Sequence, residues 1–163
     1  MKSLTITLCL SLSLSIVSTG MSWSGDYQKG LDAAQSGNYI AALKEWRPLA
    51  EQGHSESQFV LGLLYRNGKG VEKDFSTVIK WYLLAAENGH AKAQAKLGYM
   101  YVNGEGVNMN YVRAYMWGRL SEINENREGS ELKRIMTIEL NPAKIEEAER
   151  LVRECVKKDY KGC

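Results

Sequence analysis

Residues 61–71 read LGLLYRNGKGV and residues 97–107 read LGYMYVNGEGV, so nearly the same eleven residues occur twice, 36 positions apart. When residues 38–73 are aligned with residues 74–109, thirteen of the 36 positions are identical, and a partial third copy follows at residues 110–126. A fixed period of about 20–50 residues is typical of solenoids, in which each unit buries its apolar face against its neighbours. The sequence therefore predicts a repeat protein.

Each copy contains the sequence features of two helices. Asp74 and Asn110 are good N-cap residues directly ahead of helical runs. Residues 75–88 carry apolar side chains at i, i+3, i+4 and i+7 spacing, which makes one apolar helical face. The other helix of each pair is expected at residues 55–67 and 91–103. The fold class predicted is therefore all-α.

Two glycines fall inside these predicted helices. Gly62 and Gly98 lie near the middle of residues 55–67 and 91–103, where glycine costs about 1 kcal/mol of helix propensity relative to alanine. Because glycine has no side chain, we expect a neighbouring helix to approach the backbone closely at both positions.

A last helix is predicted near the C-terminus. Asn141 is a suitable N-cap, and Pro142 suits the first helical position, where its missing N–H would be unpaired in any case. We therefore expect a helix over residues 143–157 that caps the open end of the stack.

The repeated stretch also carries a long motif. It resembles the Sel1-like repeat (SLR) family, which is related to tetratricopeptide repeats (TPR), in the pattern Gln58-x-x-Leu61-Gly62-x-x-Tyr65-x-x-Gly68-x-Gly70-Val71, followed by Trp81-Tyr82-x-x-Ala85-Ala86-x-x-Gly89. Residues 114–117 and 140–148 resemble the end of small exported bacterial members. The resemblance implies a solenoid of short αα-hairpins, an SLR/TPR-like superhelix with a C-terminal capping helix.

Three parts of the chain are expected. Residues 1–20 contain one charge, Lys2, ahead of a short apolar run and small residues, which indicates a cleaved signal peptide. The apolar run is too short for the roughly 20 residues that a membrane span needs. Residues 25–126 are assigned to the solenoid, with a leading helix at residues 26–37, and residues 127–163 to C-terminal cap helices.

Cleavage would leave two cysteines, Cys155 and Cys163, in an oxidising compartment. They can pair with each other in a terminal disulfide, and the alternatives are a free thiol or an intermolecular bridge. Two cysteines alone lack the ligands for a metal site. No metal and no cofactor are expected.

The candidate catalytic and metal-binding residues have simpler explanations. His54 and His90 recur because they occupy equivalent repeat positions in turns. Equivalent positions are one repeat apart, which is too far for both imidazoles to bind one metal ion. Ser130 and Lys133 match the serine-lysine spacing of penicillin-interacting enzymes, but the companion motifs Ser-Asp-Asn and Lys-Thr-Gly are absent from the sequence. No catalytic residue is assigned.

A cysteine-rich branch of the family is associated with penicillin binding and hydrolysis. That branch carries cysteine pairs eight residues apart at positions matching Ala50 with Gln58 and Ala86 with Gln94. Since this sequence has no cysteine there, an envelope hydrolase acting on β-lactams or peptidoglycan is the alternative function rather than the expected one.

The surface expected to bind a partner is a strip on the first helix of each pair. Aligned positions that differ between the copies at 3–4 residue spacing are free to carry recognition, and in stacked helix pairs such helices line a concave face. The strip consists of Phe59, Leu63, Arg66, Lys96, Tyr99 and Val102. The alternative is that Phe59 and Leu63 pack against the leading helix.

The resemblance implies a non-enzymatic protein-protein interaction module, an adaptor or regulator of the bacterial cell envelope. Its expected partner is a protein or peptide bound by the concave face. Nucleic acid is not expected, because 21 basic and 19 acidic residues nearly cancel. We expect a monomer without a membrane span after cleavage, in the periplasm, with secretion as the alternative.

Overall fold

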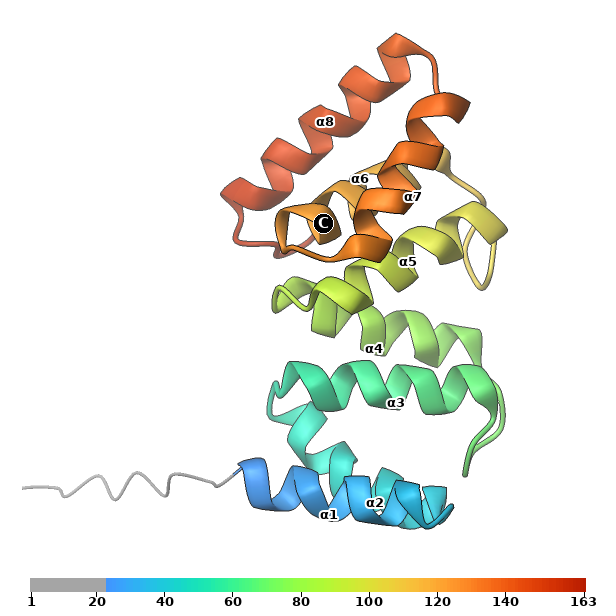
Figure 1. The fold of residues 1–163 in the computed structure, drawn as a ribbon, viewed down its shortest axis with the longest axis vertical. Coiled ribbons are helices and arrows are strands. Elements are labelled where there is room, and N and C mark those ends of the chain that lie inside the picture. The colour runs from blue at the N-terminus through green and yellow to red at the C-terminus, as the bar shows by residue number, and fades with distance from the viewer. Residues whose placement is uncertain (1–22) are drawn as a thin grey trace, which may run out of the picture.

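The computed structural model describes residues 23–163, which form eight α-helices (Figure 1). Their bounds are α1 (Trp23–Gln35), α2 (Tyr39–Glu51), α3 (Ser55–Asn67), α4 (Phe75–Glu87), α5 (Ala91–Asn103), α6 (Tyr111–Ile123), α7 (Arg127–Glu139) and α8 (Pro142–Lys157). The expected signal peptide lies outside the described residues. Within them, no helix has the length and apolar character needed to cross a membrane.

Consecutive helices pack as hairpins, α1 with α2, α3 with α4, and α5 with α6. The hairpins follow one another along the long axis of the molecule (Figure 1). Near the C-terminus, α7 packs against both α5 and α6, and α8 packs against α6. The predicted all-α hairpin solenoid with a C-terminal helix is therefore confirmed.

The helices begin where the N-cap residues predict. The side chains of Asn38, Asp74, Asn110 and Asn141 each accept a hydrogen bond from a backbone N–H in the first turn of the following helix. These bonds satisfy donors that have no partner inside the helix. Helices α3 and α5 end at Gly68 and Gly104, whose φ angles of 66° and 69° lie in the left-handed region that favours glycine.

A hydrogen-bond ladder joins the ends of neighbouring hairpins. The Gln58 side chain donates to the Ala50 carbonyl at 2.9 Å and accepts from Asn88 Nδ2 at 3.2 Å. One repeat later, Gln94 donates to the Ala86 carbonyl at 3.1 Å and accepts from Asn124 Nδ2 at 3.0 Å. Both glutamines are buried, and this ladder gives their polar side chains hydrogen-bond partners.

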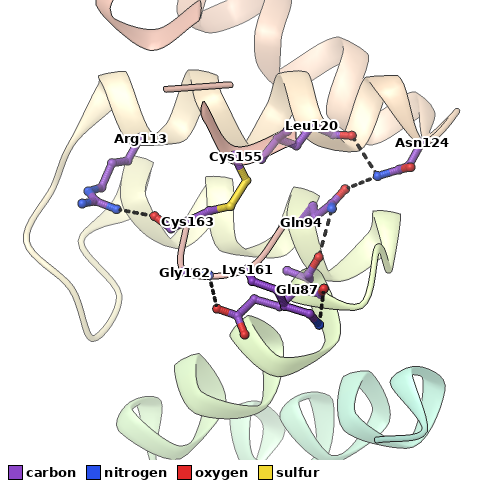
Figure 2. Close-up of a disulfide and its surroundings, with 10 residues drawn as sticks. Glu87, Gln94, Arg113, Leu120, Asn124, Cys155, Lys161, Gly162 and Cys163 are labelled. Carbon is purple, nitrogen blue, oxygen red and sulfur yellow. Dashed lines mark hydrogen bonds between the residues drawn. A yellow bond between two sulfur atoms is a disulfide. The ribbon is translucent and has the colours of Figure 1, made fainter. Parts of the chain in front are cut away.

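The C-terminal tail, residues 158–163, folds back from α8 onto the middle of the stack. Cys155 and Cys163 are joined by a disulfide with a Cα–Cα distance of 5.4 Å. Figure 2 shows the tail beside α4 and α6, where Lys161 Nζ donates to the Glu87 carbonyl at 2.7 Å and Arg113 Nη1 donates to the Cys163 carbonyl at 3.2 Å. The tail thus connects the last helix to the second hairpin.

Candidate functional site

The predicted strip lies on α3 and α5, but Phe59 does not belong to its accessible part. Phe59 is only 6% exposed, and its ring stacks on Tyr82 at 5.7 Å and on His90 at 4.6 Å between ring centroids. These partners lie further along the stack rather than on the leading helix. The assignment of Phe59 to a partner-contacting surface was therefore wrong.

Phe59 is buried because large side chains at this contact in one repeat are matched by small side chains at the equivalent contact in the next. The equivalents of Phe59 and Tyr82 one repeat later are Ala95 and Gly118, so two large rings are replaced by two small residues. The third repeat fills its space with Leu132 of α7, whose side chain lies next to Gly118. A position that differs between repeats can therefore reflect core packing instead of recognition.

The two strip cations take part in ion pairs that connect successive hairpins. Arg66 Nη2 lies 3.0 Å from Glu105 Oε2, which links α3 to the loop after α5. Lys96 Nζ lies 2.7 Å from Glu128 Oε2, which links α5 to α7. Both cationic side chains remain about a third exposed or slightly less, so each pair is weak in stability terms and open to an approaching charged group.

The remaining strip residues, Leu63, Tyr99 and Val102, are half-buried. Leu63 packs at the edge of one core cluster, and Tyr99 and Val102 pack at the edge of another. Burial raises the pKa of the Tyr99 hydroxyl, and the negative charges of Glu128 and Glu131 raise it further. The first-helix face, as it is called below, consists of Leu63, Tyr99 and Val102 together with Arg66 and Lys96. It presents apolar edges flanked by two ion pairs.

Both histidines are N-cap residues. His54 Nδ1 accepts a hydrogen bond from the Ser57 N–H, and His90 Nδ1 accepts one from the Ala93 N–H. His90 Nε2 also lies 2.8 Å from Glu56 Oε2 of the preceding hairpin, and this hydrogen bond is the main reason why the pKa of Glu56 is lowered. Their recurrence is thus explained by helix capping within the repeat.

Ser130 and Lys133 do not form a nucleophile-base pair. Ser130 Oγ donates to the Asn126 carbonyl at 3.5 Å, and Lys133 Nζ lies 3.4 Å from Glu122 Oε1. A lysine that activates a serine must lie within hydrogen-bond reach of its hydroxyl and be able to accept its proton. Lys133 is instead paired with Glu122.

Sequence reasoning did not find a second surface feature, which lies between α2 and α4. A cavity of about 460 Å³ is bordered there by the C-terminal ends of both helices and by Lys161 of the tail. Most of the residues that line it are identical in the two aligned repeats, which from the sequence indicates a structural role rather than binding. The tail contact was not foreseeable, because it depends on how α8 lies on α6.

Comparison with known proteins agrees with this architecture. The Sel1 repeat family model matches residues 55–90 and 91–121. A protective antigen of uropathogenic Escherichia coli with an SLR fold is 27% identical with a TM-score of 0.78; the match covers 86% of this chain and 32% of that protein. A Sel1 repeat protein from Oxalobacter formigenes is 28% identical with a TM-score of 0.64, over 69% of this chain and 88% of the other.

This chain spans about a third of the length of the Escherichia coli antigen. No protein with a curated description matches it. Two matched repeats in the register found from the sequence, together with the shared fold of the two solved structures, identify the repeats. Residues 55–90 and 91–121 of this chain are therefore two Sel1 repeats.

Proposed function

We propose that this protein is a non-enzymatic adaptor of the bacterial cell envelope, which binds a protein or peptide through the first-helix face. The repeats belong to a family commonly used for protein-protein interaction. The observation that carries the proposal is the composition of that face, where half-buried Leu63, Tyr99 and Val102 lie among the paired charges of Arg66 and Lys96. Aromatic and arginine side chains surrounded by other contacts supply most of the binding energy at protein interfaces.

Two features support an envelope location. The apolar run near the N-terminus has the character of a signal peptide. The Cys155–Cys163 disulfide is of the kind that persists in oxidising compartments such as the periplasm. The periplasm is therefore the proposed location, and secretion is the alternative that fractionation of cells would distinguish.

A capture experiment tests the adaptor proposal. Tagged protein is cross-linked in cells, and bound proteins are compared among the natural sequence, a Leu63→Ala/Tyr99→Ala double variant and an Ile138→Ala control. Ile138 is 72% exposed and lies on α7 outside the first-helix face. We expect one partner that the natural protein and the control retain and that the double variant loses, with circular dichroism showing that all three are folded.

The result against the proposal is a partner that the folded double variant retains as well as the natural protein does. In that outcome the first-helix face does not bind, whatever the partner is. Loss of the partner from the Ile138→Ala control as well would likewise contradict the assignment, because that substitution lies outside the face.

A further inference from the structure

We propose that the groove between α2 and α4 binds a segment of a partner protein in which an aromatic residue is followed by a basic one. This groove, called the α2–α4 groove below, is bordered by Glu51, Gly53, Trp81, Leu84 and Asn88. It is built from the second helices of two hairpins, whereas the first-helix face lies on α3 and α5. The inference is thus independent of the surface proposed above.

The α2–α4 groove has a counterpart one repeat further along the chain. Adding 36 to the residue numbers converts Glu51 to Glu87, Gly53 to Gly89 and Asn88 to Asn124. These counterparts border the site between α4 and α6 where the C-terminal tail lies (Figure 2). One copy of a repeated site is therefore occupied by a segment of this chain, and the chemistry of that segment indicates what such a site accepts.

The tail engages this site through three consecutive residues. The Tyr160 hydroxyl donates to Asn124 Oδ1 at 3.3 Å, and the Lys161 ammonium donates to the Glu87 carbonyl at 2.7 Å. The Gly162 backbone N–H donates to Glu87 Oε1 at 2.9 Å. The repeat thus matches the tail at three points. Its amide side chain accepts from an aromatic residue, its helix-end carbonyl accepts from a basic residue, and its carboxylate accepts from the following backbone N–H.

The tail residues are held in an unusual backbone conformation. Asp159 and Tyr160 have φ angles of 51° and 65°, in the left-handed region that residues other than glycine seldom adopt. Such a conformation persists only where surrounding contacts enforce it. The disulfide and the three hydrogen bonds provide those contacts, so the tail is fitted to its site.

The α2–α4 groove offers the same apolar seat, which no aromatic ring of the described residues covers, while the Lys161 side chain of the tail borders the groove. Leu120, beside the tail, is fully buried, whereas its counterpart Leu84 is 36% exposed. A Cβ atom at Gly89 would lie 4.0 Å from the Tyr160 ring, but at Gly53 no atom lies within 4 Å. The position that holds an aromatic ring in one site is therefore open in the other.

One polar acceptor of the α2–α4 groove is also available, whereas Asn88 Oδ1, the counterpart of Asn124 Oδ1, already accepts from Lys161 Nζ of the tail at 2.9 Å. No hydrogen bond or ion pair from residues 23–163 reaches the Glu51 side chain, which is the counterpart of Glu87. An accessible carboxylate at a helix C-terminus, where unpaired carbonyls also carry partial negative charge, favours a cationic side chain. The Glu51 carboxylate therefore matches a basic residue next to an aromatic one, beside the two cations, Lys80 and Lys161, that already border the groove.

The occupant is assigned to another protein rather than to the tail of a second copy. The tail of each copy is closed by its own disulfide and bonded to its own Glu87 and Asn124. Binding in trans would break those contacts to make equivalent ones, at a far lower effective concentration than within one chain. Exchange between copies is thus disfavoured.

The test is titration calorimetry of the full protein with a synthetic peptide, CVKKDYKGC, closed by a disulfide and identical to residues 155–163. We expect binding at one site, at least tenfold weaker for a Leu84→Glu variant and unchanged for an Ile138→Glu control. Replacing the peptide tyrosine by alanine should also weaken binding at least tenfold. Thermal unfolding of each variant checks that it is folded.

Three results would overturn the inference. The first is no heat of binding at millimolar peptide. The second is peptide binding that survives Leu84→Glu, because the peptide then displaces the protein's own tail. The third is concentration-dependent dimerisation that Leu84→Glu abolishes, which would assign the groove to a second copy. The Leu63→Ala/Tyr99→Ala variant should bind the peptide normally, so failure of this inference and failure of the adaptor proposal are distinguishable.

Discussion

The ring of Tyr82 occupies the space that a side chain at Gly62 would need, since a Cβ atom added there would lie 2.3 Å from Cε1 of the ring. Gly62 is buried in the middle of α3, and Tyr82 belongs to the partner helix α4 of the same hairpin. The missing side chain therefore sets how closely α3 and α4 approach. The close approach expected from the sequence is confirmed, and at Gly98 the equivalent space is filled by Leu132.

Replacing Gly62 with alanine should destabilise the protein by up to about 2 kcal/mol, because an overpacking cost of about 1–3 kcal/mol exceeds the gain of about 1 kcal/mol in helix propensity. Urea denaturation measures the free energy of unfolding. In a Tyr82→Ala background the same substitution should be neutral or stabilising. Equal losses in both backgrounds would show that the Tyr82 ring is not the cause.

Removing the Tyr82 hydroxyl should cost little. Among the described residues the Tyr82 hydroxyl is buried without a hydrogen-bond partner, and burial raises its pKa to about 12. Because no hydrogen bond is lost, Tyr82→Phe should leave the free energy of unfolding unchanged or raise it by up to about 1 kcal/mol. A loss of more than about 1 kcal/mol in chemical denaturation would contradict this account of the site.

Breaking the disulfide should loosen the C-terminal tail. A loop closed between Cys155 and Cys163, eight positions apart, restricts the unfolded chain enough to contribute about 2–3 kcal/mol. Cys163→Ser should lower the free energy of unfolding by about that amount and speed amide hydrogen exchange in the tail. Adding a reductant should destabilise the natural protein and leave the variant unaffected, and an equal effect on both would rule the disulfide out as the cause.

The free energy of unfolding should decrease as the pH is lowered, in part through His54. Burial is the main cause of its lowered pKa, and the nearby Glu56 charge opposes the shift. A lowered pKa in the folded state means that the associated stability is present above the ordinary value of about 6.5 and is lost as pH falls through the folded value. The physical reason is that burial makes the charged imidazole unfavourable, and a protonated Nδ1 would also lose the hydrogen bond from the Ser57 N–H.

The matched variant is His54→Asn, which keeps an N-cap acceptor and does not titrate. Thermal unfolding between about pH 7.5 and pH 5 should show a shallower decrease in stability for this variant than for the natural protein. Parallel curves would mean that His54 does not contribute to the pH dependence.

Local features made most of the fold predictable from the sequence. Residues 55–67 and 91–103 are helices as expected, and the helix of residues 75–88 ends one residue earlier at Glu87. Caps, glycine stops and apolar periodicity act within a few residues, so they can be recognised without knowing the rest of the molecule. The final helix begins at Pro142 for the same reason.

Long-range packing made the surface harder to predict. The burial of Phe59 depends on Tyr82 and on the small residues that replace this pair one repeat later. The return of the tail to Glu87 depends on contacts across more than seventy residues of sequence. Neither has a local sequence pattern, because both are set by how whole helices stack.

The adaptor proposal is tested most directly by site-specific photo-cross-linking in living cells. A photoreactive phenylalanine analogue replaces Tyr99 on the first-helix face or, as a control, Ile138 on the exposed side of α7. The proposal predicts a discrete cross-linked product of higher mass from position 99 and none from position 138. The same product from both positions, or a product only from position 138, would contradict binding through the first-helix face.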